Sequence, residues 1–299
     1  MTANVIALFG PTAAGKSAVA GVLRDRLGAE VVSADSAALY EGLPVLTAAP
    51  PYPARLVGTV PLDRNVSVGE YQRWAHAAVD ELLGSGALAL VVGGTGLYFR
   101  AAVSDIAIPP PAASERRVHW QDLYDRGGPA AAHALLAVRD PAAAERVHAN
   151  DRKRIVRALE LAEAGGSLAP AEDALWTAEA RHPTLLVALD LPLEVLDRRI
   201  DERAEAMTAG GAADEARRAW GQPLSDTARK VLGLEQFATL PRDEAAAAVA
   251  QATKRLARYQ RKWLRSLRGA VTLDGNRPAE EIADDVIALG RTGEHLSGH

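Results

Sequence analysis

The chain has 299 residues, of which 48% are hydrophobic and 24% are charged, and its formal net charge is −4. This composition is sufficient for one large domain, or for a domain with an insertion, and it excludes wholesale disorder. The absence of cysteine excludes a disulfide scaffold and a zinc ribbon. No apolar run approaches the roughly 18 residues that a membrane span needs. We therefore expect a cytoplasmic protein without a membrane partner.

The first segment predicts a buried strand followed by a phosphate-binding loop, rather than a signal peptide. The apolar run Val5–Phe9 leads into "GPTAAGKS" (residues 10–17), which matches G-x-x-x-x-G-K-[ST], and a helical pattern follows as far as Gly28. Glycines let backbone amides point at an anion, and the helix N-terminus adds its dipole. We expect Lys16 to supply a point charge and Ser17 to bind Mg²⁺, although a plain glycine turn would fit the same letters.

Two more strands are predicted, in "EVVSADS" (residues 30–36) and in "LALVVGGTGLY" (residues 88–98), with a helix between them. This alternation indicates a parallel sheet with right-handed crossovers, whose ligands sit at the carboxyl ends of the strands. Asp35 and Thr95 follow two of these strands and are candidates for the site. Asp35 could bind Mg²⁺ or accept a proton, or it could simply cap a helix. The glycines around Thr95 could equally form a tight strand exit without a ligand.

The pattern changes after Arg100. The proline-rich "IPPPAAS" opens a helical, alanine-rich region, and strand character returns only in "PTLLVALDL" (residues 183–191). We predict an α/β fold, a P-loop NTPase-like parallel sheet with helices on both faces, formed by residues 1–105 and 181–290. Residues 106–180 are expected to form a helical insertion, and residues 291–299 a disordered tail. Residues 44–61 are interpreted as a loop, and everything after residue 191 as helical.

Two basic segments stand out in this acidic chain. "RKRIVR" covers residues 152–157, and residues 254–268 carry seven basic side chains and no acidic one. A helix with such a composition either presents a solvated basic face or contacts phosphates. The absence of any acid over fifteen residues favours contact with phosphates.

Several motifs together resemble the tRNA dimethylallyltransferase (tRNA isopentenyltransferase) family. They are "GPTAAGKS", "SADS…LY", "GGTGLY", "HANDRKRIVRALE", "LDLPLEVLDRRIDERAEAM" and "QATKRLARYQRKWLR", in this order. They extend from residue 10 to about residue 265, whereas residues 44–70 and 106–145 match poorly. Their joint occurrence is far more specific than the phosphate loop alone.

The resemblance implies transfer of a five-carbon prenyl group from dimethylallyl diphosphate to the exocyclic amine of the adenosine just 3′ of the anticodon, with Mg²⁺ required. Asp35 would be the catalytic base, and Thr95 would lie at the same reaction centre. The diphosphate-binding residues would be Gly10, Thr12, Ala13, Ala14, Gly15, Lys16, Ser17 and Arg203. For Arg203, a surface ion pair with Asp201 or Glu202 is the alternative.

The resemblance also implies a tRNA-binding set, with the insertion holding the anticodon loop and the protein acting as a monomer. The set comprises Asp35, Ser36, Ala38, Arg117, Lys153, Arg154, Arg157, Arg255, Arg258, Arg261 and Lys262.

The chain departs from the family pattern mainly at recognition positions. Ala38 stands where the family usually has glutamine, Ala49 replaces a lysine, and Tyr259 replaces a basic residue. A usual pair of histidines is missing from "ARLVGTVP". We therefore expect prenyl transfer to be retained and substrate recognition to be altered or relaxed.

Three other functions remain open at this point. The acceptor could be a free adenine nucleotide rather than tRNA. The phosphate loop could belong to a small-molecule kinase, although an insertion of some 70 residues is longer than most connections and fits a macromolecular substrate better. The protein could also be a non-catalytic RNA-binding switch that is ordered by a bound nucleotide.

Overall fold

The computed structural model describes residues 3–109, 114–169, 179–292 and 296–297. The chain forms two compact units. One, the core unit, comprises residues 1–105 and 179–299, and the other, the insertion unit, comprises residues 106–178. Among the described residues, no helix is both long and apolar enough to cross a bilayer.

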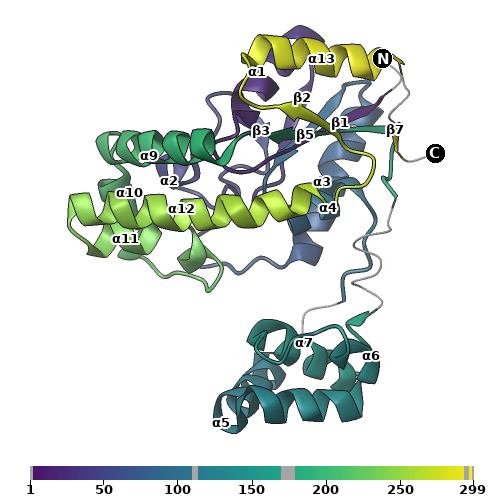
Figure 1. Ribbon diagram of the computed structural model, residues 1–299, viewed down its shortest axis with the longest axis vertical. Helices are drawn as coiled ribbons and strands as arrows, with labels where there is room; N and C mark the ends of the chain where they lie inside the picture. Colours follow the sequence, from purple (N-terminus) through teal and green to yellow (C-terminus); the bar gives the residue numbers. More distant parts are fainter. Residues whose placement is uncertain (1–2, 110–113, 170–178, 293–295, 298–299) are drawn as a thin grey trace. The chain divides into compact units, whose positions relative to one another are not determined.

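The core unit is built on a parallel sheet with strand order β3-β2-β4-β1-β5-β6 (Figure 1). Every residue of β1 is buried, because the strand lies between β4 and β5 and is covered by helices on both faces. This explains its uninterrupted apolar sequence. The strands are β1 Val5–Phe9, β2 Glu30–Ser33, β3 Ala54–Arg55, β4 Ala89–Gly93, β5 Thr184–Asp190 and β6 Val271–Asp274.

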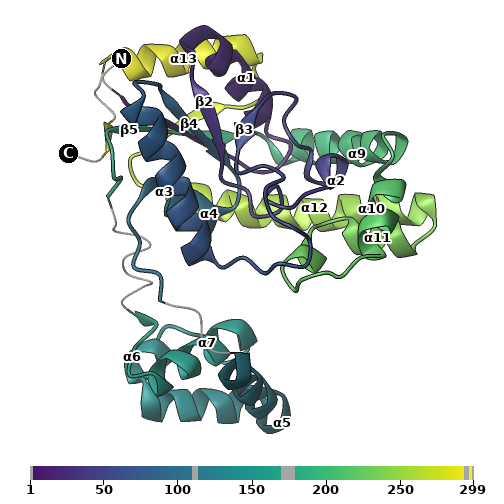
Figure 2. The same cartoon turned by 180° about the vertical axis from the view of Figure 1, so that it is seen from behind.

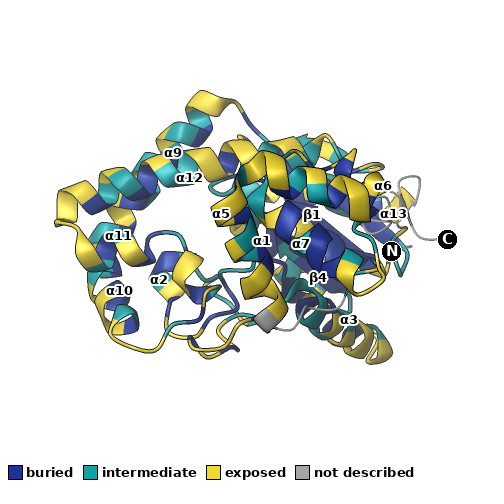
Figure 3. Ribbon diagram, turned by 90° about the horizontal axis from the view of Figure 1, so that it is seen from below, coloured by how far each residue is buried: buried dark blue, intermediate teal, exposed yellow. Residues whose placement is uncertain are grey.

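Helices cover both faces of the sheet, as Figures 1 and 2 show. Helices α1 (Lys16–Leu27) and α13 (Ala279–Thr292) pack together on one face. Helices α3 (Val68–Gly84), α4 (Gly96–Val103) and α12 (Arg242–Leu264) lie on the other. The predicted P-loop NTPase-like α/β fold is confirmed. In Figure 3, α9 (Leu193–Ala209) and α12 show buried residues on their packed faces and exposed residues on their outer faces.

A group of helices extends the core unit beyond the carboxyl ends of the strands. Helix α9 (Leu193–Ala209) packs along α12, and α10 (Ala212–Trp220) contacts both α11 (Leu234–Thr239) and the short α2 (Pro44–Thr47). The buried carboxylate of Glu215 on α10 accepts hydrogen bonds from the amides of Val45 and Leu46, at 3.0 and 2.8 Å. This charged cap fixes the start of α2 and so positions the segment that follows it.

The interpretation of residues 44–61 as a loop is wrong in part, because it includes α2 and β3. The expectation of helix throughout the region after residue 191 is also wrong, because β6 adds to the sheet beside β5. Both strands are short and lie at the two edges of the sheet, and the residues of β6 alternate between half-buried and exposed. Neither strand therefore has the continuous apolar run that marks a central strand.

The predicted disordered tail is corrected at four positions. Residues 291–292 complete α13, and β7 (Leu296–Ser297) pairs antiparallel with the start of β5. The remaining positions of that tail, 293–295 and 298–299, lie outside the described residues.

The insertion unit is helical in its described part. It contains α5 (Ser114–Arg139), α6 (Pro141–Ala144) and α7 (Arg152–Glu163). Trp120, Leu136 and other side chains form an apolar core between α5 and α7. Gly128, at a φ of 79°, breaks α5 just before Pro129.

The close approach of β4 to the segment after β2 generates a test of this packing. A Cβ atom at Gly93 would lie 2.2 Å from the carbonyl oxygen of Ala34, which is backbone and has little room to move. We expect Gly93→Ala to lower the free energy of unfolding by about 1–3 kcal/mol or more. Gly84→Ala is the matched control, because nothing lies within 4 Å of that position in α3. Urea unfolding of both variants checks this, and equal effects would contradict it.

Candidate active site

The phosphate loop leaves β1 and ends at the first turn of α1. Ala13 and Gly15 adopt left-handed backbone conformations, with φ of 64° and 89°. The conformation costs glycine little but strains alanine. The amides of Ala18 and Val19 donate to the carbonyl oxygen of Gly15, which leaves the amides of Lys16 and Ser17 and the helix dipole for an anion.

Lys16 is held inside this loop by a backbone contact. Its Nζ atom donates a hydrogen bond to the carbonyl oxygen of Pro11 at 2.8 Å. Burial lowers the pKa of Lys16 from 10.5 to about 8, and Arg203 contributes to this decrease, whereas the carboxylate of Asp35 opposes it. An anionic ligand would compensate for the lost solvation of the ammonium group.

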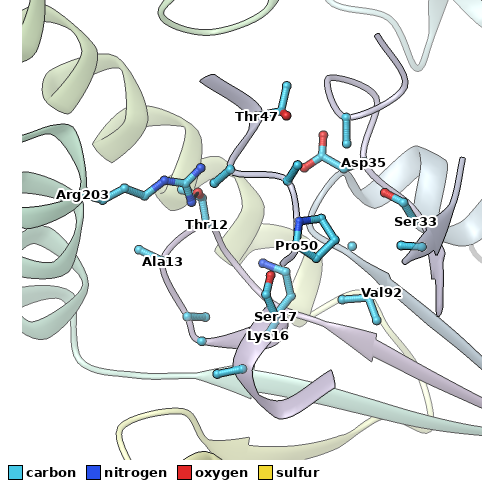
Figure 4. Close-up of a pocket in the computed structure, with 18 of the residues that line it drawn as sticks. Thr12, Ala13, Lys16, Ser17, Ser33, Asp35, Thr47, Pro50, Val92 and Arg203 are labelled. Atoms are coloured by element: carbon cyan, nitrogen blue, oxygen red, sulfur yellow. Dashed lines mark hydrogen bonds between the residues drawn. The ribbon is translucent and has the colours of Figure 1, made fainter. Parts of the chain in front are cut away.

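A cavity of about 550 Å³ opens over the loop. Residues 12–17 line one side, Arg203 of α9 lines another, and Ala48, Ala49 and Pro50 belong to the wall that follows α2. In Figure 4, Arg203 and Asp35 extend into this cavity from opposite sides, with Lys16 and Ser17 near the loop. Gly10 is not among the described residues that line it. A Cβ atom at Gly10 would lie 3.0 Å from the carbonyl oxygen of Leu189, so this glycine permits packing on β5.

A second cavity, of about 230 Å³, adjoins the first. Thr95 and Ser36 line it, together with apolar side chains such as Met207 and Leu256. The residues that line both cavities are Thr12, Asp35, Thr47, Arg203 and Gln260. Asp35 therefore lies at the boundary between the cavity over the loop and its neighbour.

Asp35 makes a local backbone contact and also lines both cavities. One carboxylate oxygen, Oδ1, accepts a hydrogen bond from the amide of Ala37 at 2.9 Å, which fixes a local turn. No helix starts at this turn, so Asp35 is not a helix cap. The turn holds the carboxylate at the carboxyl end of β2, facing both cavities.

Arg203 is directed to the phosphate loop. Its Nη1 atom donates to the hydroxyl of Thr12 at 3.2 Å. Burial lowers the pKa of Arg203, and Asp35 opposes this decrease. The alternative of a surface pair with Asp201 or Glu202 is wrong, since Asp201 pairs with Lys254 and Glu202 with Arg198.

The glycines around Thr95 serve helix packing. A Cβ atom at Gly96 would lie 2.0 Å from the ring of Trp263, and one at Gly94 would lie 2.7 Å from the carbonyl oxygen of Gly10. Helix α12 and the phosphate loop therefore approach this turn so closely that a side chain at either glycine would clash with them. Thr95 precedes α4 without capping it through its side chain.

Comparisons with known proteins show the family of the chain. The family model described as IPP transferase matches residues 38–267. A tRNA dimethylallyltransferase of Anaeromyxobacter dehalogenans is 37% identical over 95% of this chain and 97% of its own length. One from Streptomyces coelicolor is 40% identical over 88% of this chain and 87% of its own length.

The chain belongs to the tRNA dimethylallyltransferase (IPP transferase) family. Among solved structures, a full-length tRNA isopentenylpyrophosphate transferase of Bacillus halodurans superposes with a TM-score of 0.67 at 25% identity, covering 97% of each chain. A eukaryotic dimethylallyltransferase acting on tRNA has a TM-score of 0.81 at 20% identity, covering 98% of this chain and 80% of its own, and supports the fold alone.

Two positions where the chain differs from the tRNA dimethylallyltransferase pattern lie in the first cavity. Ala38 is buried and Ala49 is partly exposed, and both are lining residues. Neither side chain can donate a hydrogen bond. Tyr259, the third difference, is 56% exposed on α12.

The structure divides the basic residues of α12 into two sets. Facing α9 and β5, Lys254 pairs with Asp201, Arg258 with Asp197 and Arg261 with Asp190, each at 2.7 Å. On the exposed surface, Arg255 and Lys262 form no ion pair with any residue that the structure describes. Basic residues occur all along this segment of the sequence, so the sequence alone did not show which of them form ion pairs and which are exposed.

The basic residues of the insertion unit also differ in their surroundings. Arg117 and Arg157 both pair with the buried carboxylate of Glu160, at 3.0 and 3.1 Å. Lys153 and Arg154 are exposed at the start of α7. A role in binding tRNA remains a prediction for all four.

Sequence reasoning missed Gln260, which is buried on α12 and lines both cavities. Its Oε1 atom accepts a hydrogen bond from the amide of Thr12 at 2.8 Å, and the amide of Ala14 donates to the carbonyl oxygen of Pro11. Two amides that we expected to bind diphosphate therefore have partners within the protein. A lone glutamine in a basic helix carried no signal of this contact.

The depressed pKa of Lys16 predicts a pH dependence of diphosphate binding. Above pH 8 the free site loses the Lys16 proton that the bound anion requires, so log Kd should rise by up to about one unit per pH unit. Below pH 8 this contribution is constant. Calorimetric titration with inorganic diphosphate from pH 6.5 to 9.5 measures the profile. Lys16→Arg, which stays protonated, should lack the break, and the same break in both proteins would contradict the assignment.

Proposed function

We propose that the protein transfers a dimethylallyl group from dimethylallyl diphosphate to the exocyclic amine of the adenosine 3′-adjacent to the anticodon of tRNA, releasing diphosphate. The supporting observation is the position of Asp35, between the phosphate-binding cavity and the second cavity. The names of the family members support the reaction class.

The first cavity would bind the diphosphate as the leaving group. Lys16 and Arg203 line this cavity, and the first turn of α1 adjoins it. They would stabilise the negative charge that grows as the carbon–oxygen bond breaks. Preorganised donors of this kind favour the transition state, because the charge on the departing oxygens is larger there than in the substrate.

Ser17 is the protein residue that we propose as a ligand of Mg²⁺. Its side chain lines the cavity next to Lys16. Within the described residues there is no group of three His, Cys, Asp or Glu side chains suited to a metal. This fits Mg²⁺, which commonly uses one or two protein ligands and completes its shell with substrate phosphates and water. When bound, the ion would neutralise charge on the departing diphosphate.

Asp35 would act on the acceptor. The exocyclic amine of adenine is a weak nucleophile, and a carboxylate can orient it and accept its proton as the nitrogen–carbon bond forms. The allylic carbon–oxygen bond breaks in the same reaction, and its electrons leave with the diphosphate. Thr95, across the second cavity, is proposed to contact the adenosine, which must be turned out of the anticodon loop to enter.

Binding of tRNA is proposed to use exposed cations on both units. Lys153 and Arg154 of α7, with Arg255 and Lys262 of α12, would contact phosphates, while Ser36 lines the cavity that would receive the base. Both cavities are formed within one chain, so we propose a monomer. A tRNA acceptor is consistent with a cytoplasmic protein.

A free adenine nucleotide is the second candidate acceptor. Ala38 and Ala49 leave a methyl-lined wall where the family usually offers polar side chains, and this could relax the choice of acceptor. A prenyl-transfer assay, run with adenosine monophosphate and with an anticodon stem-loop, distinguishes the two acceptors.

Replacing Asp35 separates chemistry from binding. We expect Asp35→Asn to reduce single-turnover transfer to an anticodon stem-loop by at least about 100-fold, because the amide does not accept the proton. Calorimetry should show that diphosphate affinity is retained or increased, because the substitution removes one negative charge beside Lys16 and Arg203. Asp226→Asn, an exposed position outside both cavities, is the control. Transfer by Asp35→Asn within tenfold of the unmodified protein would refute a role as the base.

The exposed cations of α12 predict the salt dependence of RNA binding. Each lost phosphate contact should reduce the slope of log K against log salt by about 0.7–0.9. Arg255→Met/Lys262→Met should therefore reduce it by about 1.4–1.8, as measured by filter binding at several salt concentrations. An unchanged slope would remove this surface from the RNA interface. Arg258→Met should lower Tm, because it removes the ion pair with Asp197. If it also reduces the slope of log K against log salt, Arg258 contacts RNA as well.

A further inference from the structure

Gln260 is a buried neutral side chain in the most basic stretch of the chain. Only 4% of it is exposed, whereas its neighbours Tyr259 and Lys262 lie on the surface of α12. Its Oε1 atom accepts a hydrogen bond from the amide of Thr12, 248 positions away in the sequence. The contact joins the C-terminal helix directly to the phosphate loop.

The other end of the same amide lies against the turn that follows β4. A Cβ atom at Gly94 would be 2.8 Å from the Nε2 atom of Gln260. One side chain thus fills the space between the phosphate loop and the turn that carries Thr95. Because Gln260 also lines both cavities, it lies at their boundary together with Asp35.

Ion pairs hold α12 where this contact is possible. The pairs of Lys254, Arg258 and Arg261 precede, flank and follow Gln260 along the helix. Arg261 binds Asp190 through two parallel hydrogen bonds, of 2.7 and 2.8 Å, at the end of β5. Bidentate pairs of this kind fix geometry as well as distance. The pair with β5 therefore fixes the position of Gln260 relative to the sheet.

Thr12 relays the contact to Arg203. The amide of Thr12 donates to Gln260, and its hydroxyl accepts from Nη1 of Arg203 at 3.2 Å. The orientation of the Thr12 residue therefore depends on α12, and the position of the buried guanidinium depends on Thr12. Loss of the glutamine would leave a donor in the loop unsatisfied and would free the loop to rotate.

We propose that Gln260 is a positioning residue for the prenyl donor. It fixes Thr12, and through Thr12 it fixes Arg203, in the geometry that receives the diphosphate. This inference rests on the proposed function for the identity of the donor. The side chain must accept a hydrogen bond and must also be uncharged, because it borders the cavity that takes an anion.

Two substitutions separate these requirements. Gln260→Met keeps the approximate size and removes both polar atoms, while Gln260→Glu keeps the acceptor for Thr12 and adds a negative charge. Gln251→Met makes the same chemical change at an exposed position of α12 outside both cavities, and serves as the control. The three readouts are Kd for inorganic diphosphate with Mg²⁺, Kd for an anticodon stem-loop, and Tm.

We expect Gln260→Met to raise the Kd for diphosphate by about tenfold or more, as loss of a hydrogen bond and its geometry predicts. The Kd for RNA should stay within about twofold, since the exposed cations are untouched. Gln260→Glu should retain more of the Tm than Gln260→Met and yet bind diphosphate more weakly, because charge repulsion adds to its effect. A role in packing alone would make Tm and diphosphate affinity change together in the two variants.

The inference is overturned if Gln260→Met binds diphosphate with a Kd within twofold of that of the unmodified protein. It is also overturned if, in Gln260→Met and Gln260→Glu alike, the loss of diphosphate affinity is proportional to the decrease in Tm. These binding measurements require no turnover. If the unmodified protein fails to prenylate RNA while diphosphate binding still depends on Gln260, the proposed function fails and the positioning role stands. If prenylation occurs and Gln260→Met is unaffected, only the positioning role fails.

Discussion

Two buried cations at one edge of the sheet dominate the electrostatics of this protein. Burial lowers the pKa of both Lys16 and Arg203, Arg203 lowers that of Lys16 further, and the carboxylate of Asp35 opposes the decrease in both. The carboxylate of Asp35 balances these two cations incompletely, so the cavity favours a ligand with several negative charges. The same imbalance leaves Asp35 in a position to act on a neutral acceptor in the adjoining cavity.

The long basic helix α12 has both a structural and a surface role. Its inner cations pair with acids of α9 and β5, and the glycine turn after β4 lets it approach closely enough for Trp263 to pack against Gly96. Its outer cations remain for a polyanion. Under the proposed function, a substitution on the inner face of this helix would act on the donor cavity, and one on the outer face would act on RNA binding.

Much of the site could be predicted from the sequence, because the relevant signals are local. The phosphate loop, the buried run of β1 and the polar ends of β2 and β4 each lie within a few residues. The fold around them was harder to predict where strands are short and lie at an edge of the sheet, as β3 and β6 do. Contacts over long sequence separations left no local trace. The bond between Thr12 and Gln260 is one example, and the pairing of Arg258 and Arg261 with acids of the core is another.

The wall opposite the phosphate loop has a further consequence. Ala38, Ala48 and Ala49 contribute methyl groups to the cavity lining, whereas the cationic side chains among the described lining residues, Lys16, Arg199 and Arg203, come from the loop, α1 and α9. When an anion held by these cations departs, it has to break contacts only with that one side of the cavity. Turnover would then be limited by how quickly Lys16 and Arg203 release the inorganic product, and the alanine wall would neither retain it nor repel it.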